Sequence, residues 1–386
     1  MKKVLAYIIL LLSIFMLASC ASNNDSKTII LHDAFSITPY INVIGKKNDI
    51  LKYDDQVYND LSNALINLDD KYSVEKENSI VSLINKSGGK EFVSVDDETL
   101  YIIRKAIEIS DNTKYHNNDS KYDVTVYPLV EAWGFMHKYF HGDNYYQALD
   151  ESVAKEVAEY VDYHKIIIQD NSIKLQDEGM KIDLGSIVKG YACDVLSNIM
   201  NEKYPYFSYI INVGGNIYTC GKTQREGKKS DFHIGIQTPF YDELSKEIVD
   251  IEVRNNAYYI GYIIGKEEGT TVVTSGIYER YIKDTDGNMY HHILDKETGY
   301  PIDNDLSSLT IIINGANSSI LADAYSTALF GMGSKEAINY ANENNMQVVV
   351  VTKENKIYTS EACTENFVYN SVLNNCGFSY NIGNNQ

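Results

Sequence analysis

Hydrophobic and polar positions repeat with two different periods along the chain, which indicates a mixture of helices and strands. Apolar residues recur at helical spacing over residues 56–68, and again after Asp96 and Asp97, either of which can cap a second helix. Further helices are predicted over residues 151–161, from a turn near Gly185 to about Met200, and over residues 317–331.

Period-two alternation and short β-rich runs predict strands between these helices. Strands are expected over residues 33–45, 210–217 and 309–313, and as two hairpins that pair 166–168 with 173–175 and 347–351 with 356–359. Because hairpins are mixed with separate helices, the predicted fold class is α+β, with mixed or antiparallel sheets and packed helices.

A third hairpin carries two adjacent histidines. Its β-rich runs 278–282 and 289–294 flank Asp286-Gly287, a strong hairpin signal because both central residues of a type I′ turn need positive φ. Neighbouring strand residues point to opposite faces, so only one of His291 and His292 can enter a given pocket. That histidine is a candidate general base, whereas the alternative is that both pack as cross-strand fillers.

The first residues have the layout of an export signal. Lys2 and Lys3 precede an apolar run over residues 4–17, and Leu17-Ala18-Ser19-Cys20 resembles a bacterial lipoprotein box. We therefore expect residues 1–19 to be a lipoprotein signal peptide and Cys20 to be lipidated. Residues 20–30 are expected to form a tether, and residues 31–386 the functional domain.

Size and charge limit the function. Removal of 19 residues from 386 leaves 367, enough for one large domain. The formal charge of -19 argues against nucleic acid as a partner, and it means that a phosphate-bearing ligand needs a metal ion or a local cluster of donors.

The cysteines beyond Cys20 allow three pairings, and an exported protein could use any of them. These cysteines are Cys193, Cys220, Cys363 and Cys376. A bridge between Cys363 and Cys376 is the favoured expectation. Their spacing matches no zinc site.

The segment from Asp183 to Asp194, DLGSIVKGYACD, joins a strand to a helix through a glycine turn. Such a turn can offer free N–H groups to an anion, and Lys189 in the first helical turn adds positive charge. An ordinary strand-to-helix turn with a surface lysine explains the segment equally well.

Asp323 and Thr327 lie four residues apart on the helix predicted over 317–331, so both oxygen-bearing side chains share one face. A carboxylate and a hydroxyl are a suitable partial shell for Mg²⁺, which prefers oxygen ligands and commonly bridges to substrate phosphates. The alternative is a solvated pair, which the small apolar neighbours disfavour.

Taken together and in this order, DLGSIVKGYACD, INVGGNI, TSGIYERYI with HHILDKETGYP, and LADAYSTAL resemble the ApbE family. The resemblance covers residues 35–359 and implies an ApbE-like, T-fold-like architecture. It also implies Mg²⁺-dependent transfer of FMN from FAD to a Ser or Thr hydroxyl of an exported or membrane-bound flavoprotein, with release of AMP. The protein would then be lipid-anchored on the extracytoplasmic side of the cell membrane.

The resemblance also assigns site residues. It implies that His292, rather than His291, helps to deprotonate the accepting hydroxyl. Magnesium ligands would be the carbonyl of Ser186 with Asp323 and Thr327. The FAD site would include Asp183, Lys189, Tyr122, Asp123 and the backbone of Ile293.

Three positions depart from the family pattern. Lys296 stands where proline is usual and is expected to loosen its turn, while Ser36 and Glu75 replace residues that would contact the flavin ring. A loosely held flavin could admit water, so an FAD pyrophosphatase is the second hypothesis. A flavin-storing lipoprotein without chemistry is the third, and the presence of Asp323 and His292 speaks against it.

Overall fold

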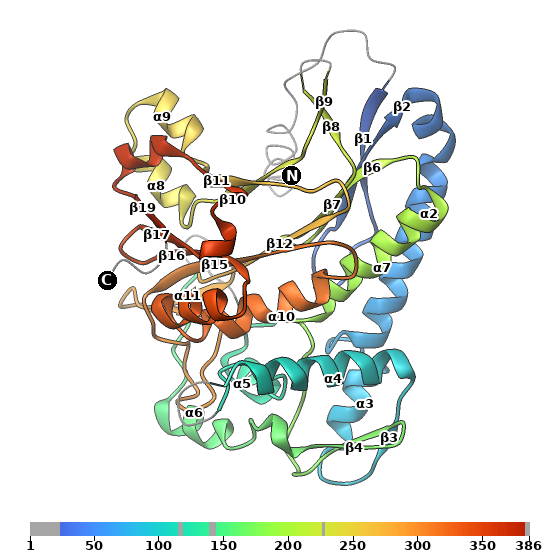
Figure 1. Cartoon of the computed structure of the whole chain (residues 1–386). Coiled ribbons are helices and arrows are strands. Elements are labelled where there is room, and N and C mark those ends of the chain that lie inside the picture. The colour runs from blue at the N-terminus through green and yellow to red at the C-terminus, as the bar shows by residue number, and fades with distance from the viewer. Residues whose placement is uncertain (1–23, 115–118, 139–143, 226–227, 383–386) are drawn as a thin grey trace.

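A nine-stranded sheet forms the centre of the computed structural model, which describes residues 24–114, 119–138, 144–225 and 228–382 (Figure 1). Its strand order is β1-β2-β6-β7-β12-β15-β16-β17-β19. Neighbouring strands are antiparallel except β17 and β19, which are parallel. The predicted α+β class with mixed or antiparallel sheets is therefore confirmed.

The strands of this sheet are β1 (Asn24–Ile30), β2 (Tyr40–Lys46), β6 (Ser208–Val213), β7 (Asn216–Cys220), β12 (Thr270–Gly276), β15 (Leu306–Asn314), β16 (Gln347–Thr352), β17 (Lys356–Thr359) and β19 (Ser379–Ile382). Four smaller sheets consist of β10 (His233–Gln237), β11 (Tyr259–Ile264) and β18 (Phe367–Tyr369); β3 (Val93–Ser94), β5 (Ser172–Leu175) and β4 (Ile166–Gln169); β13 (Tyr281–Lys283) and β14 (Met289–His291); and β8 (Thr223–Arg225) and β9 (Lys228–Ser230).

The α-helices are α2 (Lys47–Tyr72), α3 (Ile80–Lys86), α4 (Asp97–Asn112), α5 (Tyr127–Trp133), α6 (Glu151–Ala158), α7 (Val188–Lys203), α8 (Tyr241–Glu247), α9 (Ile251–Asn256), α10 (Ser319–Phe330) and α11 (Ser334–Glu343). The described residues also form the short 3₁₀ helices η2 (Tyr163–Lys165), η3 (Glu361–Cys363) and η4 (Ser371–Cys376). Among the described residues, no helix is long and apolar enough to cross a bilayer.

Four helices pack against the large sheet and follow the order of its strands. Helix α2 packs on β1 and β2, α7 on β6 and β7, α10 on β12 and β15, and α11 on β16 and β17. Side-chain alternation divides the central strands between two cores. Val273 and Ile311 pack among the residues of α10 and α11, whereas Val272 and Ile312 pack with the small sheet that contains β10 and β11. The centre of the sheet is therefore buried on both faces.

Several sequence predictions are confirmed. Asp96 caps α4 by accepting the N–H of Thr99, and the two short hairpins form as β4 with β5 and as β16 with β17. The predicted strand over residues 210–217 is instead two strands, β6 and β7, because Gly214 and Gly215 both adopt positive φ and turn the chain back.

The predicted tether is wrong over residues 24–30, which form strand β1 on the edge of the large sheet. Ile29 is buried beneath α2, and this burial helps to keep the otherwise polar segment paired with β2. The first strand predicted over 33–45 begins later, at Tyr40, because Phe35 and Ser36 form a tight turn with positive φ. The signal peptide and Cys20 lie outside the described residues.

The predicted bridge between Cys363 and Cys376 is also wrong, since all four described cysteines are free thiols. Cys363 is fully buried in an apolar core, whereas Cys376 is partly exposed at the end of η4.

Removal of strand β1 should destabilise the protein measurably. A chain that begins at Leu31 loses seven residues of edge pairing and the burial of Ile29, which alone is worth about 2 kcal/mol. A chain that begins at Asn24 keeps both. Urea unfolding of the two chains compares their stabilities, and equal midpoints would show that β1 is dispensable.

Candidate functional site

Helices α7 and α10 cross in close contact at Gly190. A Cβ atom on Gly190 would lie 2.1 Å from the carbonyl oxygen of Ser319 and 2.7 Å from Cβ of Asp323, so only glycine fits there. The Gly190 N–H donates to Oδ2 of Asp323 at 2.8 Å, and Nζ of Lys189 lies 3.8 Å from Oδ1. The crossing therefore places the predicted metal carboxylate beside the predicted phosphate-binding lysine.

Asp194 fixes the start of α10 from the neighbouring helix. Its two carboxylate oxygens each accept a backbone N–H, from Ser319 and from Ile320, at 2.9 Å. Burial raises the pKa of Asp194 to about 6, and the nearby charge of Asp323 adds to this shift. Sequence reasoning missed Asp194, because an N-cap supplied by another helix leaves no local signature.

The glycine turn before α7 offers fewer free N–H groups than expected. Gly185 donates its N–H to Oδ1 of Asp183 at 2.8 Å, while Ile187 and Val188 donate theirs to the carbonyl of Leu184. The N–H groups of Ser186 and Lys189 have no acceptor within the described chain. The Nζ of Lys189, the predicted anion ligand, donates to the carbonyl of Gly185.

Asp183 lies in the same turn, between positive charges. Burial raises the pKa of Asp183, and its bond from Gly185 together with Lys189 and Arg280 opposes that shift. The carboxylate therefore lies within electrostatic reach of both cations.

Ser186 and Thr327 complete the predicted metal set. The hydroxyl of Ser186 donates to the hydroxyl of buried Tyr122 at 3.2 Å. Burial raises the pKa of Tyr122, with further contributions from Asp323 and Asp183, so the phenol stays protonated next to both carboxylates. Thr327 lies on the same face of α10 as Asp323, and its hydroxyl is 3.3 Å from that of Ser275 on β12.

This donor set suits magnesium better than a softer metal. No group of three or more His, Cys, Asp and Glu side chains in the described part of the chain is placed to hold a metal ion. The residues assigned to a cation are one carboxylate, Asp323, and two neutral oxygens, the hydroxyl of Thr327 and the carbonyl of Ser186, and together with water these are the kind of shell that Mg²⁺ adopts.

The two histidines have different surroundings. His291 is 5% exposed, and both its nitrogens are engaged, Nε2 with the carbonyl of Ile302 at 3.1 Å and Nδ1 with the N–H of Ile293 at 3.3 Å. His292 bonds through Nδ1 to the carbonyl of Arg280 at 3.0 Å, and its Nε2 has no protein partner among the described residues. Because a carbonyl only accepts, Nδ1 of His292 carries the proton and Nε2 presents a lone pair.

Electrostatics keep both imidazoles neutral. Burial lowers the pKa of His291 to about 4. Burial and the positive charge of Arg280 lower the pKa of His292 to about 3, and Lys189 acts in the same direction. These properties match the prediction of His292 as the base and His291 as the packed neighbour, although the catalytic role itself stays a prediction.

The hairpin that carries the histidines differs from the predicted type I′ turn. Its loop has five residues, 284–288, of which Gly287 alone has positive φ. Asp284 organises the loop by accepting the N–H groups of Asp286 and Asn288.

Arg280 at the base of this hairpin was not singled out by sequence reasoning. Its charge acts on both Asp183 and His292, and among the described residues no carboxylate forms an ion pair with it. A cation that acts on the same two groups as Lys189 and has no ion-pair partner among the described residues is a candidate for binding a phosphate group.

Asp123 and Ile293 are more fully engaged within the protein than predicted. Oδ1 of Asp123 accepts bonds from Thr125, and Oδ2 accepts the N–H of Tyr163 at 2.9 Å. The N–H of Ile293 donates to His291, and its carbonyl accepts from Ile302 at 2.9 Å. Their predicted contact with FAD stays a prediction, and the contacts within the protein give both residues a structural role.

Lys296 tightens its turn, contrary to the expectation for a residue that replaces proline. Its side chain is 8% exposed, and Nζ lies 2.8 Å from Asp119 and 3.5 Å from Asp123. Lys121 also binds the same loop through Asp295 and Glu297. The loop after the histidine hairpin is thus fastened to the segment that contains Tyr122.

Comparisons with known proteins agree on one family. The model of the ApbE family matches residues 37–351. The chain is 30% identical over 295 residues to an FAD:protein FMN transferase of Klebsiella pneumoniae, with coverage of 76% of this chain and 81% of the relative. An FAD:protein FMN transferase of Haemophilus influenzae is 25% identical over 367 residues, covering 94% of this chain and 96% of the relative.

Solved structures show the same fold. The ApbE protein of Thermotoga maritima aligns with a TM-score of 0.71 and 28% identity, over 88% of this chain and 99% of that structure. The flavin transferase ApbE of Vibrio cholerae aligns with a TM-score of 0.69 and 23% identity, over 89% of this chain and all, 100%, of that structure.

The tautomers of the two histidines are testable by imidazole ¹⁵N NMR. Between pH 7 and about pH 5 both rings should stay neutral, with the proton on Nδ1 in His292 and on Nε2 in His291. Since both pKa values lie below the usual 6.5, the unfolded chain binds protons first, and these rings destabilise the fold as the pH falls from 6.5 towards 4. Titration of either ring near pH 6.5 would contradict this electrostatic description.

Proposed function

The chain belongs to the ApbE family, and from that premise we propose how its site transfers FMN from FAD to a protein. It is an FAD:protein FMN transferase. The observation that carries the mechanism is the neutral His292, whose unpartnered Nε2 lies within electrostatic reach of Arg280 and Lys189. Such an arrangement combines a proton acceptor with cations that attract a diphosphate.

In the proposed mechanism, FAD binds with its pyrophosphate near Lys189 and Arg280, and Asp183 lies in the same turn. Tyr122 and Asp123 line the flavin side, and the backbone of Ile293 contacts FAD. The acceptor is a Ser or Thr hydroxyl of an exported or membrane-bound flavoprotein. His292 takes the hydroxyl proton at Nε2 while the oxygen attacks the phosphorus of the FMN half, and the bond to AMP breaks.

Magnesium is the proposed metal, held by Asp323, Thr327 and the carbonyl of Ser186. When bound, it would neutralise charge on the phosphates and orient them. The chain's own contribution is to hold Asp323 in place through the N–H of Gly190, while the neutral oxygens of Thr327 and Ser186, with water, would complete the shell.

A second activity, hydrolysis of FAD to FMN and AMP, is favoured by one observation. Ser36 donates to Oε2 of Glu75 at 2.5 Å, and the charge of Glu75 reaches Tyr127, which is also within reach of Asp183. Two polar side chains therefore occupy positions where a flavin ring would find apolar contact. Water could compete with the protein hydroxyl if the flavin is held loosely there.

We also propose that Cys20 carries a lipid anchor on the extracytoplasmic side of the cell membrane. The apolar run before a small-residue tetrad that ends in cysteine supports this location. An anchored enzyme would meet acceptor subunits at the same membrane. The net charge of -19 argues against nucleic acid as a partner.

The main test incubates the chain from Ala21 onward with FAD, Mg²⁺ and an acceptor domain, and measures AMP together with the mass of the acceptor. Transfer predicts one FMN added for each AMP released. Without the acceptor, little AMP should appear. Rapid AMP release that leaves the acceptor unmodified would instead establish the hydrolase.

Replacement of His292 by Asn should lower the rate of transfer by about 10²–10⁴-fold while FAD still binds, because the proton acceptor is lost. His291→Asn is the matched control, since that ring is buried and both its nitrogens are engaged. It should reduce stability more than the transfer rate measured well below the unfolding temperature. The assignment is reversed if His291→Asn abolishes transfer in a folded protein and His292→Asn does not.

A further inference from the structure

The ends of four neighbouring strands meet at one end of the large sheet. Asn24 pairs with Lys46, Ile44 pairs with Ser208, and Tyr209 pairs with Cys220. The start of β1, the end of β2, the start of β6 and the end of β7 therefore lie together. The hairpin of β8 and β9 continues from β7 and rises beside β1 and β2 at the top of Figure 1.

Exposed basic side chains gather at this end, although the whole chain has a formal charge of -19. We call the set of Lys46, Lys47, Arg225, Lys228 and Lys229 the basic end, and all five side chains are exposed. Acidic residues on the adjoining segments include Asp25 and Asp49, and Asp54 is paired with Lys27. Nearby, Lys222 is paired with Asp231 and Glu267, whereas the five side chains of the basic end have no ion-pair partner among the described residues.

Two large apolar side chains project among these charges. Leu51 is 61% exposed and Tyr206 is 48% exposed. Tyr206 lies against Tyr53 with ring centroids 5.4 Å apart, so it is held in place at the surface. Tyrosine and leucine among basic residues are typical of a surface that contacts lipid headgroups.

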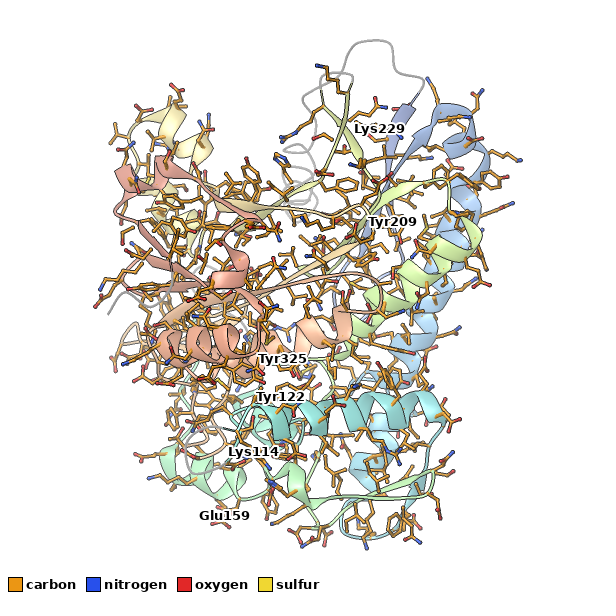
Figure 2. The ribbon with its side chains drawn as sticks, viewed as in Figure 1. Lys114, Tyr122, Glu159, Tyr209, Lys229 and Tyr325 are labelled. Carbon is orange, nitrogen blue, oxygen red and sulfur yellow. The ribbon has the colours of Figure 1, made fainter. Side chains whose placement is uncertain are left out.

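The opposite end of the molecule, called the acidic end below, has exposed carboxylates without an ion-pair partner among the described residues, Glu156, Glu159 and Asp170. Glu178 nearby is paired with Lys90. Figure 2 shows Glu159 and Lys229 at the two extremes of the molecule. An anionic membrane would repel the acidic end and attract the basic end.

The segment between Cys20 and β1 is short enough to keep one end of the molecule near a membrane that holds a lipid on Cys20. Cys20 precedes Asn24 by four residues, which span at most about 14 Å when fully extended. A lipid on Cys20 would therefore hold the Asn24 end of β1 close to the membrane surface, and Lys46 lies directly beside Asn24.

We propose that the basic end, with Leu51 and Tyr206, lies against the anionic headgroups of the membrane that holds the anchor. This orientation rests on the proposed lipidation of Cys20. Helix α7 then links the membrane to the site, because its last residue, Lys203, is close to Tyr206 and its second residue is Lys189. Between Lys189 and Lys203 the helix rises about 21 Å, which is the distance along α7 between the site and its last residue.

The test places a tryptophan at each end of the acylated, full-length protein in vesicles that contain brominated phosphatidylglycerol. Tyr206→Trp reports the basic end. Tyr160→Trp is the matched control, because Tyr160 is 37% exposed and follows α6 at the acidic end. Native Trp133 is 2% exposed, and its signal is subtracted with the unsubstituted protein. Mass spectrometry first confirms the acyl chain.

Brominated lipid should quench the fluorescence of the tryptophan at position 206 and leave the fluorescence of the one at position 160 unchanged. Charge reversal by Lys228→Glu with Lys229→Glu should reduce the quenching at 206, whereas Lys155→Glu, on α6, should not. Equal quenching at both positions of an acylated protein would overturn the orientation alone. A mature protein without an acyl chain would overturn both the anchor and the orientation, and the transfer assay would be unaffected.

Discussion

The contact between α7 and α10 is the constraint on which the site depends. Gly190 lets the two backbones approach, and its N–H holds one oxygen of Asp323. Four residues further along α7, Asp194 caps the first turn of α10. The same helix pair thus positions a carboxylate, a lysine and the hydroxyl of Thr327 before any ligand arrives. A side chain at position 190 would separate the helices and move all of these groups together, which is why the geometry is fixed by packing rather than by the charges themselves.

Patterns in the sequence predicted the elements that are stabilised by interactions between residues close together in the chain, such as helix caps and hairpin turns. Asp96 caps α4 as expected, and the hairpin turns form where polar dipeptides interrupt β-rich runs. Contacts between distant segments could not be predicted in this way. Residues 24–30 look like a polar tether until they pair with β2, and the N–H groups near Gly185 look free until Asp183 and Leu184 accept them. Asp194 and Arg280 escaped notice for the same reason, because their partners lie more than 90 residues away along the chain.

Lys296 shows how a departure from a family pattern can be compensated. Proline would stiffen the loop through its fixed φ, whereas Lys296 fastens it through an ion pair with the partly exposed Asp119 and a longer contact to the buried Asp123. Removal of one partner from such a pair leaves an uncompensated charge. The loop is therefore held by charge balance, and it keeps Ile293 and His292 close to the segment that contains Tyr122. The same cations that lower the pKa of His292 would bind phosphate, so arrival of an anion would raise the basicity of the ring when a base is needed.

The distribution of charge bears on where the proposed anchored enzyme would work. A net charge of -19 would keep most of this surface away from an anionic membrane, so an anchored form needs one end on which the sign is reversed. That end is where β1 begins, and β1 itself is a strand rather than a flexible tether. A rigid strand transmits the position of the anchor directly to the sheet, and the sheet to α7. The site would then stand at a fixed height above the membrane, to which α7 contributes its length, within reach of hydroxyls on acceptor segments that project by a comparable distance. A long flexible tether would impose no such selection by height, so under the proposed anchoring the early start of β1 would couple the anchor to the choice of acceptor.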